Sequence, residues 1–349
     1  MPGGRPDAGV VPGRMDFVFL TPSPDPAGGG SRFNAGLVPA LRAAGHGVTV
    51  RHDAERLPDG VRPVVDGMLL PDLEPRLDAL LAAGAVAVMH HVSARAGRDD
   101  TISQPGSQPG SQAGSQAGRE AGRRMLPRLS RVIATSLPVA ERLQVDHGLA
   151  DVPVLLPGIA ELARAGGSGG PGVHILSAGV ITPRKGHDRL LRALSRLVDL
   201  EWTLTIAGDA QRDAVHAKSV AAAIEEHGLA SRVTLLADPS DAALDAEWAR
   251  ADLFALASSW EAYPSGIAEA LRRGIPVVGP SVGEVPAMVP HSAGILCPPD
   301  DAVTLSKCLR RAIFDLGLRA ALAEGAWQAG QAMPGWPQQA LAFLSLIEE

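Results

Sequence analysis

Two glutamates, Glu261 and Glu269, lie eight positions apart on either side of a turn-forming Pro-Ser-Gly run. The apolar run 251–259 before them is short enough to be a buried parallel strand, and 268–273 after them reads as a helix. A helix that starts at such a turn presents backbone N–H groups that favour a phosphate. The segment therefore predicts a strand-to-helix corner that binds an anion carrying hydroxyl groups. A surface loop followed by an ordinary amphipathic helix is the alternative interpretation of the same sequence pattern.

A pair of cations, Arg184 and Lys185, stands between an expected strand, 174–178, and an expected helix, 187–197. Two adjacent positive charges at the carboxyl end of a strand can neutralise a diphosphate, and a lysine ammonium is a compact charge for a departing phosphate. A solvated basic turn is the alternative. The position at a strand-to-helix switch favours the functional interpretation.

The first half of the chain offers a glycine run and a histidine pair. Gly28-Gly29-Gly30 precedes the first expected helix, where glycine permits close approach to a ligand. Phe33 stands where Gly-x-Gly-x-x-Gly needs its third glycine, so the dinucleotide-binding fingerprint is absent. His90 and His91 end an apolar strand, and because neighbouring strand residues point oppositely, one of them should face a cleft. A flexible turn and a structural histidine are the competing interpretations.

These residues need a scaffold of short buried strands that alternate with helices, and the chain supplies this pattern twice. It predicts an α/β domain over 15–164, a flexible linker at 165–172, a second α/β domain over 173–332, and a segment 333–349 that crosses back to the first domain. Residues 1–14 are expected to be a disordered extension. The stretch 99–118, with four tandem tetrapeptides at 103–118, is expected to be a disordered insert.

The expected elements follow from periodicity and turn residues. Strands are expected at 16–21, 47–51, 85–90, 131–135, 152–156, 174–178, 202–207, 232–237, 251–259 and 276–279. Helices are expected at 31–44, 187–197, 213–227, 241–250, 268–273 and 338–347. Ligands are expected in the cleft between the domains, at the carboxyl ends of the strands.

Composition narrows the class of protein. The chain has 349 residues, 46% of them hydrophobic, which favours two domains, and its net charge of −6 argues against a nucleic-acid binder. Cys297 and Cys308 lack metal-ligand spacing, and they predict a reducing, cytoplasmic location. No apolar run reaches the length of a membrane-spanning helix. The arginine-rich segment 119–131 could touch an anionic acceptor or a membrane surface, although a solvated charged face is favoured.

With these motifs and this two-domain pattern, the chain resembles the retaining glycosyltransferases of family 4 (glycosyl transferases group 1). The resemblance runs from Met15 onward, except for the repeat insert. The strongest part is 252–300, where Glu-x7-Glu is followed by Gly-Ile-Pro-Val-Val, Gly-Glu-Val-Pro and Gly-Ile-Leu-Cys-Pro-Pro-Asp. The resemblance implies the α/β GT-B fold, two facing Rossmann-like domains with parallel sheets and a deep interdomain cleft. It also implies transfer of a sugar from a nucleotide-diphosphate sugar to an acceptor hydroxyl, with retention at the anomeric carbon and with neither a metal nor another cofactor.

The resemblance also assigns roles to residues. Glu269 would bind the ribose hydroxyls of the nucleotide, and Glu261 would face the donor sugar. His91 would stand near the reacting sugar, with His90 on the acceptor side as the alternative to it. The residues implied around the diphosphate and the rest of the donor are Lys185, Arg184, Gly179, Ser265, Gly266, Ile267, Gly29 and Gly30.

One departure from the family pattern concerns Val180. Family members usually have Gly-Arg where this chain has Gly179-Val180, and Arg184 is a plausible substitute for the missing arginine. The alternatives are a nucleotide-sugar epimerase or phosphorylase on the same fold, and a nucleotide-sugar-binding protein without turnover. The sequence identifies neither the donor's base and sugar nor the acceptor, which could be a saccharide, a lipid-linked group or a small metabolite.

Overall fold

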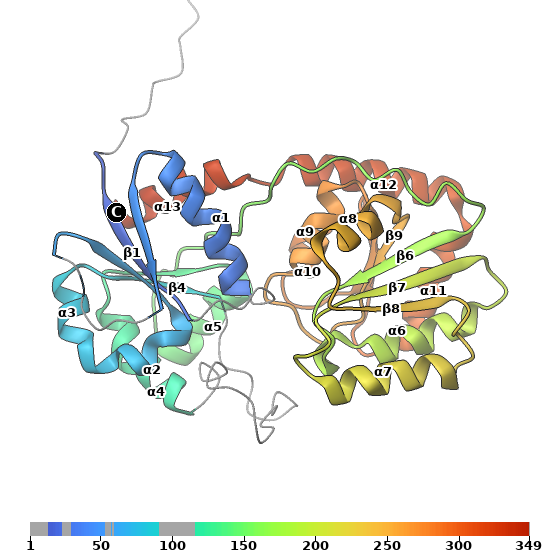
Figure 1. Ribbon diagram of the computed structural model, residues 1–349, viewed down its shortest axis with the longest axis horizontal. Coiled ribbons are helices and arrows are strands. Elements are labelled where there is room, and N and C mark those ends of the chain that lie inside the picture. The colour runs from blue at the N-terminus through green and yellow to red at the C-terminus, as the bar shows by residue number, and fades with distance from the viewer. Residues whose placement is uncertain (1–12, 23–28, 53–56, 58, 91–115, 349) are drawn as a thin grey trace, which may run out of the picture.

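The computed structural model describes residues 13–22, 29–52, 57, 59–90 and 116–348, and these form two α/β domains side by side (Figure 1). Residues 1–12 of the expected extension and 99–115 of the expected insert lie outside the described residues, as does His91. What the sequence predicts for them stays a prediction.

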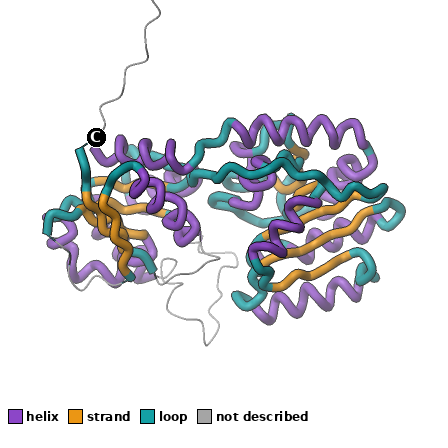
Figure 2. The backbone as a smooth tube through the Cα atoms, turned by 45° about the horizontal axis from the view of Figure 1, so that its top comes forward, coloured by secondary structure: helices purple, strands orange, loops and turns teal. Residues whose placement is uncertain are grey.

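The first domain is built on a parallel five-stranded sheet with the order β2-β1-β3-β4-β5. The strands β1, β3 and β4 are buried along nearly their whole length, because helices cover both faces of the sheet (Figure 2). The strands are β1 Asp16–Leu20, β2 Gly47–Arg51, β3 Arg62–Asp66, β4 Val86–Met89 and β5 Arg131–Ala134. The helices are α1 Gly29–Ala43, α2 Leu70–Leu73, α3 Leu77–Ala82, α4 Gln116–Met125 and α5 Leu137–His147.

The second domain is built on a parallel six-stranded sheet with the order β11-β10-β9-β6-β7-β8. The strands are β6 Val173–Ala178, β7 Trp202–Gly208, β8 Val233–Ala237, β9 Leu253–Ala255, β10 Val277–Pro280 and β11 Gly294–Cys297. The helices are α6 His187–Leu194, α7 Ala214–Glu226, α8 Asp241–Arg250, α9 Ser265–Arg272, α10 Val285–Met288, α11 Ala302–Phe314 and α12 Leu316–Gln331.

The strand order reverses in the middle of this second sheet. From β6 the chain winds outward through β7 to β8, and from β9 it winds the other way through β10 to β11. The first strands of the two halves, β6 and β9, pair directly, with Ile175 opposite Leu253. The loops that leave their carboxyl ends therefore diverge above a shared crevice, which is where open α/β sheets bind ligands.

Several elements differ from the expectation. Strands β3 and β11 and helices α5, α11 and α12 form where the sequence analysis predicted no element. The strand expected at 152–156 is reduced to one bridge between Ala134 and Val154. The run 251–259 forms a strand only over Leu253–Ala255, because its remainder curves away toward Glu261. Helix α9 begins at Ser265, three residues before the expected start, so the turn residues are part of its first turn.

The chain crosses between the domains before the glycine-rich stretch 165–172. Leu155 packs in the core of the first domain, whereas Ile159 packs against the second and donates its amide to Pro334 O at 3.0 Å. Gly158 lies where the chain crosses, and a Cβ at this position would come within 2.7 Å of the backbone nitrogen of Trp336. The stretch 165–172 itself runs along the second domain, and Gly166 N donates to Ala249 O.

Helix α13, Trp336–Glu348, returns the chain to the first domain and lies beside α1 (Figure 1). Its buried face contributes Phe343, Leu344 and Ile347 to the core under β1, and the Phe343 ring lies 5.9 Å from that of Phe17. Among the described residues, no helix combines the length and hydropathy needed to cross a membrane.

Candidate active site

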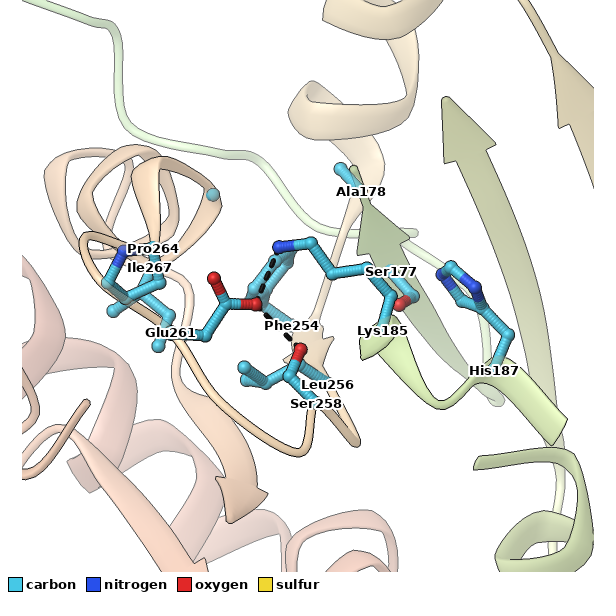
Figure 3. Close-up of a pocket in the computed structure, with 11 residues that line it drawn as sticks. Ser177, Ala178, Lys185, His187, Phe254, Leu256, Ser258, Glu261, Pro264 and Ile267 are labelled. Atoms are coloured by element: carbon cyan, nitrogen blue, oxygen red, sulfur yellow. Dashed lines mark hydrogen bonds and ion pairs between the residues drawn. The ribbon is translucent and has the colours of Figure 1, made fainter. Parts of the chain in front are cut away.

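The central feature of the second domain is a small cavity at the strand-order reversal, between the loops that follow β6 and β9 (Figure 3). Its volume of about 20 Å³ has room for one water molecule. The lining residues are Ser177, Ala178, Lys185, His187, Phe254, Leu256, Ser258, Glu261, Pro264, Gly266 and Ile267. The structure thus brings together Lys185, Glu261 and the start of α9, which the sequence predicted as parts of one site.

Glu261 is a buried residue of this cavity, only 3% exposed, and its carboxylate has three polar partners among the described residues. Lys185 Nζ donates to Glu261 Oε1 at 2.5 Å and Ser258 Oγ donates to the same oxygen at 2.7 Å (Figure 3). Arg184 Nη1 lies 3.3 Å from Glu261 Oε2. Burial raises the pKa of Glu261, but the charges of Lys185 and Arg184 outweigh that effect and hold the pKa below its usual value. The carboxylate is therefore ionised and matched by two cations.

The turn that carries the two cations is fixed against the neighbouring strand. Residues Pro183–Lys185 form a 3-10 turn that ends at Gly186 in the left-handed conformation, with φ 65°. A Cβ at Gly186 would lie 2.2 Å from Ala257 O, so only glycine fits there. Burial lowers the pKa of Lys185, and the Glu261 carboxylate opposes this shift by favouring the ammonium. At Gly179 the backbone φ of 150° favours glycine, and a Cβ there would meet Lys185 Cε at an ordinary 3.4 Å.

Arg184 is held at the rim of the cavity. Besides Glu261, its Nη1 contacts the Trp260 carbonyl oxygen at 2.7 Å. Its side chain is 32% exposed, so solvent and ligands can reach it. Whether it substitutes for the arginine expected at Val180 stays a prediction.

His187 is the first residue of helix α6, close to Lys185, and it lines the cavity although no role was assigned to it from the sequence. It is buried, and its Nδ1 has no hydrogen-bond partner among the described residues. Burial, with a smaller contribution from the Lys185 charge, lowers the pKa of His187 to about 3. The imidazole is thus neutral at physiological pH and adds no competing cation.

The start of α9 presents fewer amides than the sequence predicted. Ser265 N already donates to Tyr263 O at 3.0 Å, and Ile267 N donates to Pro264 O at 2.9 Å. Of the three residues expected to offer amides, only Gly266 has an N–H without an acceptor within the described part of the chain. The expectation of three available amides is wrong for this conformation, because the helix begins at Ser265 and its first turn uses two of them.

Glu269 lies in the second turn of α9, outside the cavity lining. Its Oε1 pairs with Arg273 Nη2 at 3.1 Å, and its side chain is 29% exposed. Burial raises the pKa of Glu269, and the Arg273 charge opposes that shift. The carboxylate remains accessible to a hydroxyl-bearing ligand that lies along the helix.

In the first domain, His90 and Asp66 end the neighbouring strands β4 and β3 under the start of α1. His90 is 6% exposed, its Nε2 has no hydrogen bond within the described residues, and it lies 3.6 Å from Asp66 Oδ2. Burial lowers the pKa of His90 to about 4. A Cβ at Gly30 would lie 2.7 Å from Asp66 Oδ2, so this glycine allows α1 to approach the pair. Asp66 was missed by the sequence analysis, although a carboxylate that ends an apolar strand is a recognisable signal.

Among the residues that the structure describes, two polar side-chain contacts join the domains across the cleft. Arg32 Nη1 on α1 contacts Ser265 Oγ at the start of α9 at 3.3 Å. Leu137 N, the first residue of α5, donates to Glu284 Oε2 at 3.2 Å. Neither Arg32 nor Glu284 was assigned a role from the sequence, because nothing in the sequence relates the orientations of the two domains.

Arg124 and Arg128 of the arginine-rich segment lie beside acidic side chains. Arg124 forms a two-armed ion pair with Glu74, Arg128 lies 3.6 Å from Asp78, and Arg123 donates to the Asp146 carbonyl oxygen. This favours the interpretation of the segment as a solvated charged face.

Within the described residues, no group of three or more His, Cys, Asp or Glu side chains could hold a metal ion.

Comparison with known proteins places the second domain in a family. The sequence profile described as glycosyl transferases group 1 matches residues 161–328. A curated relative, the D-inositol 3-phosphate glycosyltransferase of Mycobacterium sp. (strain KMS), is 32% identical over 149 residues, which are 42% of this chain and 34% of that protein. The match thus spans about a third of the relative's length.

Solved structures resemble the whole chain. Sucrose-phosphate synthase from Thermosynechococcus elongatus aligns with a TM-score of 0.80 at 18% identity, over 96% of this chain and 98% of that one. Anabaena HepE in complex with UDP and glucose aligns with a TM-score of 0.74 at 18% identity, over 96% of this chain and 100% of that one. At this identity the likeness shows the fold alone, and it confirms the GT-B fold. Residues 161–328, which form most of the second domain, match the glycosyl transferases group 1 family.

Proposed function

We propose that the protein transfers a sugar from a nucleotide-diphosphate sugar to an acceptor hydroxyl, with retention of the anomeric configuration. The observation that carries the proposal is the cluster of Lys185, Arg184 and buried Glu261 at the strand-order reversal of a group 1 domain. Preorganised cations aimed at a departing group are the main requirement of this chemistry. The structure of HepE with UDP and glucose supports the donor class, since that protein shares the fold.

In the proposed reaction, the bond between the anomeric carbon and the diphosphate oxygen breaks while the acceptor oxygen bonds to the same face of that carbon. The acceptor proton passes to the departing phosphate. Lys185 and Arg184 stabilise the charge that develops on the phosphate, so the protein's own cations do the work that a metal does elsewhere. Glu261 orients Lys185 before the donor binds and then accepts hydrogen bonds from the sugar hydroxyls. Glu269 binds the ribose hydroxyls.

On the first domain, Gly29 and Gly30 would pack against the donor, and His90 or His91 would stand on the acceptor side. The match to the family model lies in the second domain, so it supports the donor half of the proposal and no particular acceptor. We place the reaction in the cytoplasm, in line with two free cysteines.

The test is a panel of UDP, GDP, ADP and dTDP sugars offered with mixed acceptors, followed by mass detection of the glycosylated product and of the released nucleotide. Release that depends on an acceptor, with a product of retained configuration by NMR, supports the transferase. Conversion of the donor sugar without an acceptor would indicate an epimerase. Release of the nucleotide that requires inorganic phosphate would indicate a phosphorylase. Binding without release under any of these conditions contradicts the proposal and leaves a binding protein.

A further inference from the structure

Arg32 is a cation of the first domain that reaches the start of α9 in the second. It is an exposed residue in the first turn of α1, and its Nη1 contacts Ser265 Oγ at 3.3 Å. Ser265 is the first residue of α9, and Gly266 and Ile267 beside it line the cavity with Lys185 and Glu261. Arg32 therefore stands across the cleft from the proposed diphosphate position.

The charges of the second domain alone match a diphosphate poorly. Lys185 and Arg184 contribute two positive charges, but the buried Glu261 carboxylate between them cancels one. A diphosphate in a nucleotide sugar carries more than one negative charge and gains another when the sugar leaves. A further cation is needed near the same place, and the expected arginine is absent because Val180 occupies its position.

The electrostatic field of Arg32 already reaches the site. Burial is the main cause of the low pKa of Lys185, and the Arg32 charge adds to that shift. Burial likewise dominates the raised pKa of Glu269, and Arg32 is among the charges that oppose it. Arg32 thus acts on groups on both sides of the α9 start.

The start of α1 is fixed by packing, which sets the direction of Arg32. The neighbouring Phe33 packs edge-on against His90 and Trp336, with ring centroids 5.0 Å and 5.7 Å away. Gly30 allows the helix to lie directly on Asp66 and His90. An arginine on an anchored turn loses less conformational freedom when it binds a ligand than one on a mobile loop.

We propose that Arg32 is a cross-cleft phosphate-binding residue, which exchanges its Ser265 contact for the leaving diphosphate and so replaces the arginine missing at Val180. This inference rests on the proposed function. It has a consequence for motion: because Arg32 belongs to the other domain, it stabilises the diphosphate only when the cleft is closed as in this structure. Diphosphate binding should therefore favour the closed arrangement.

The test is calorimetric binding of UDP, GDP and ADP, with UMP, GMP and AMP for comparison, to the full-length protein and to Arg32→Gln. A charge-assisted hydrogen bond predicts a loss of about 10- to 100-fold in affinity for the diphosphate that the wild type prefers, with a smaller loss for its monophosphate. Arg32→Lys should keep part of the diphosphate affinity. The matched control is Arg128→Gln, an exposed first-domain arginine near the still more exposed Asp78, which should leave both affinities unchanged.

The outcomes separate this inference from the proposed function. If the wild type binds a nucleoside diphosphate and Arg32→Gln binds it equally well, the inference is wrong while the proposed donor site stands. If the wild type binds none of the diphosphates, both fail. Equal losses for Arg32→Gln and Arg128→Gln would show a general charge effect and would also overturn the assignment.

Discussion

Lys185 and Glu261 form an ion pair across the strand-order reversal of the second sheet, with Nζ 2.5 Å from Oε1. The two residues come from loops 76 positions apart in the chain, and the direct pairing of β6 with β9 brings them together. The carboxylate holds the ammonium in place and keeps it charged before any ligand arrives. The cavity beside the pair has room for only one water molecule.

The pair predicts separate effects on activity and on stability. In Lys185→Met the departing phosphate loses its closest cation, and we expect turnover of the donor to fall about 100- to 1,000-fold. The same change leaves buried Glu261 with only Arg184 and Ser258, and we expect the free energy of unfolding to fall by about 2–4 kcal/mol. Nucleotide release and urea unfolding measure the two effects.

The double variant Lys185→Met/Glu261→Gln distinguishes the two roles. Removing the carboxylate's charge should recover most of the lost stability, because no unpaired charge remains buried. Turnover should stay low, because the cation is still missing. A double variant that recovers turnover together with stability would show that Lys185 acts only in holding the fold.

His90 predicts a dependence of stability on pH. Its folded-state pKa of about 4 lies below the unfolded value of about 6.5, so the unfolded chain binds more protons between these values. Stability should therefore fall as the pH drops through this window, and His90 alone should contribute a loss of about 2 kcal/mol between pH 7 and pH 5. In His90→Gln this part of the slope should vanish in urea unfolding at the two pH values. Equal slopes in the two proteins would mean that the imidazole is not held neutral.

The sequence predicts which residues form the site better than it predicts which of them contact one another. Lys185 and Glu261 were recognisable because charged residues follow apolar strands, and parallel strands bring such positions to one edge. That they pair with each other could not be read, since it depends on which strands are neighbours. The amides of Ser265 and Ile267 were overcounted because the helix starts three residues early. Contacts between domains follow from an orientation that no local pattern encodes.

We predict that Glu284, a residue of the second domain, stabilises helix α5 of the first domain. Ser136, at the N-cap of α5, makes no capping bond with its side chain, and Glu284 Oε2 accepts the Leu137 amide instead. In Glu284→Ala we expect the free energy of unfolding to fall by about 1 kcal/mol, as for a lost helix cap. Solution scattering should also show a larger radius of gyration, because a link between the domains is gone. Glu141→Ala, an exposed change on α5 itself, should neither lower the free energy of unfolding nor enlarge the molecule, because it removes a charge that repels Glu284.

Gly36 and Trp336 predict a link between the C-terminal helix and the first domain. A Cβ at Gly36 on α1 would lie only 1.9 Å from Trp336 Cε2, and the tryptophan backbone is backed by Gly158, so the ring has little room to move. Although alanine favours helix over glycine, we expect Gly36→Ala to destabilise the protein by about 1–3 kcal/mol through overpacking. The matched control is Gly317→Ala on α12, where a Cβ meets only Asp315 at an ordinary 3.6 Å. That change should be neutral or stabilising by up to about 1 kcal/mol.

A double variant tests whether the ring itself is the obstacle. Trp336→Ala alone should destabilise the protein, because it removes a ring that packs on Phe33. Adding Gly36→Ala to it should cost nothing further, since the new methyl group then has space. Thermal unfolding of the four proteins gives the coupling energy directly. Additive losses would mean that Gly36→Ala acts elsewhere, and α13 would then not hold α1, with its Arg32, in place.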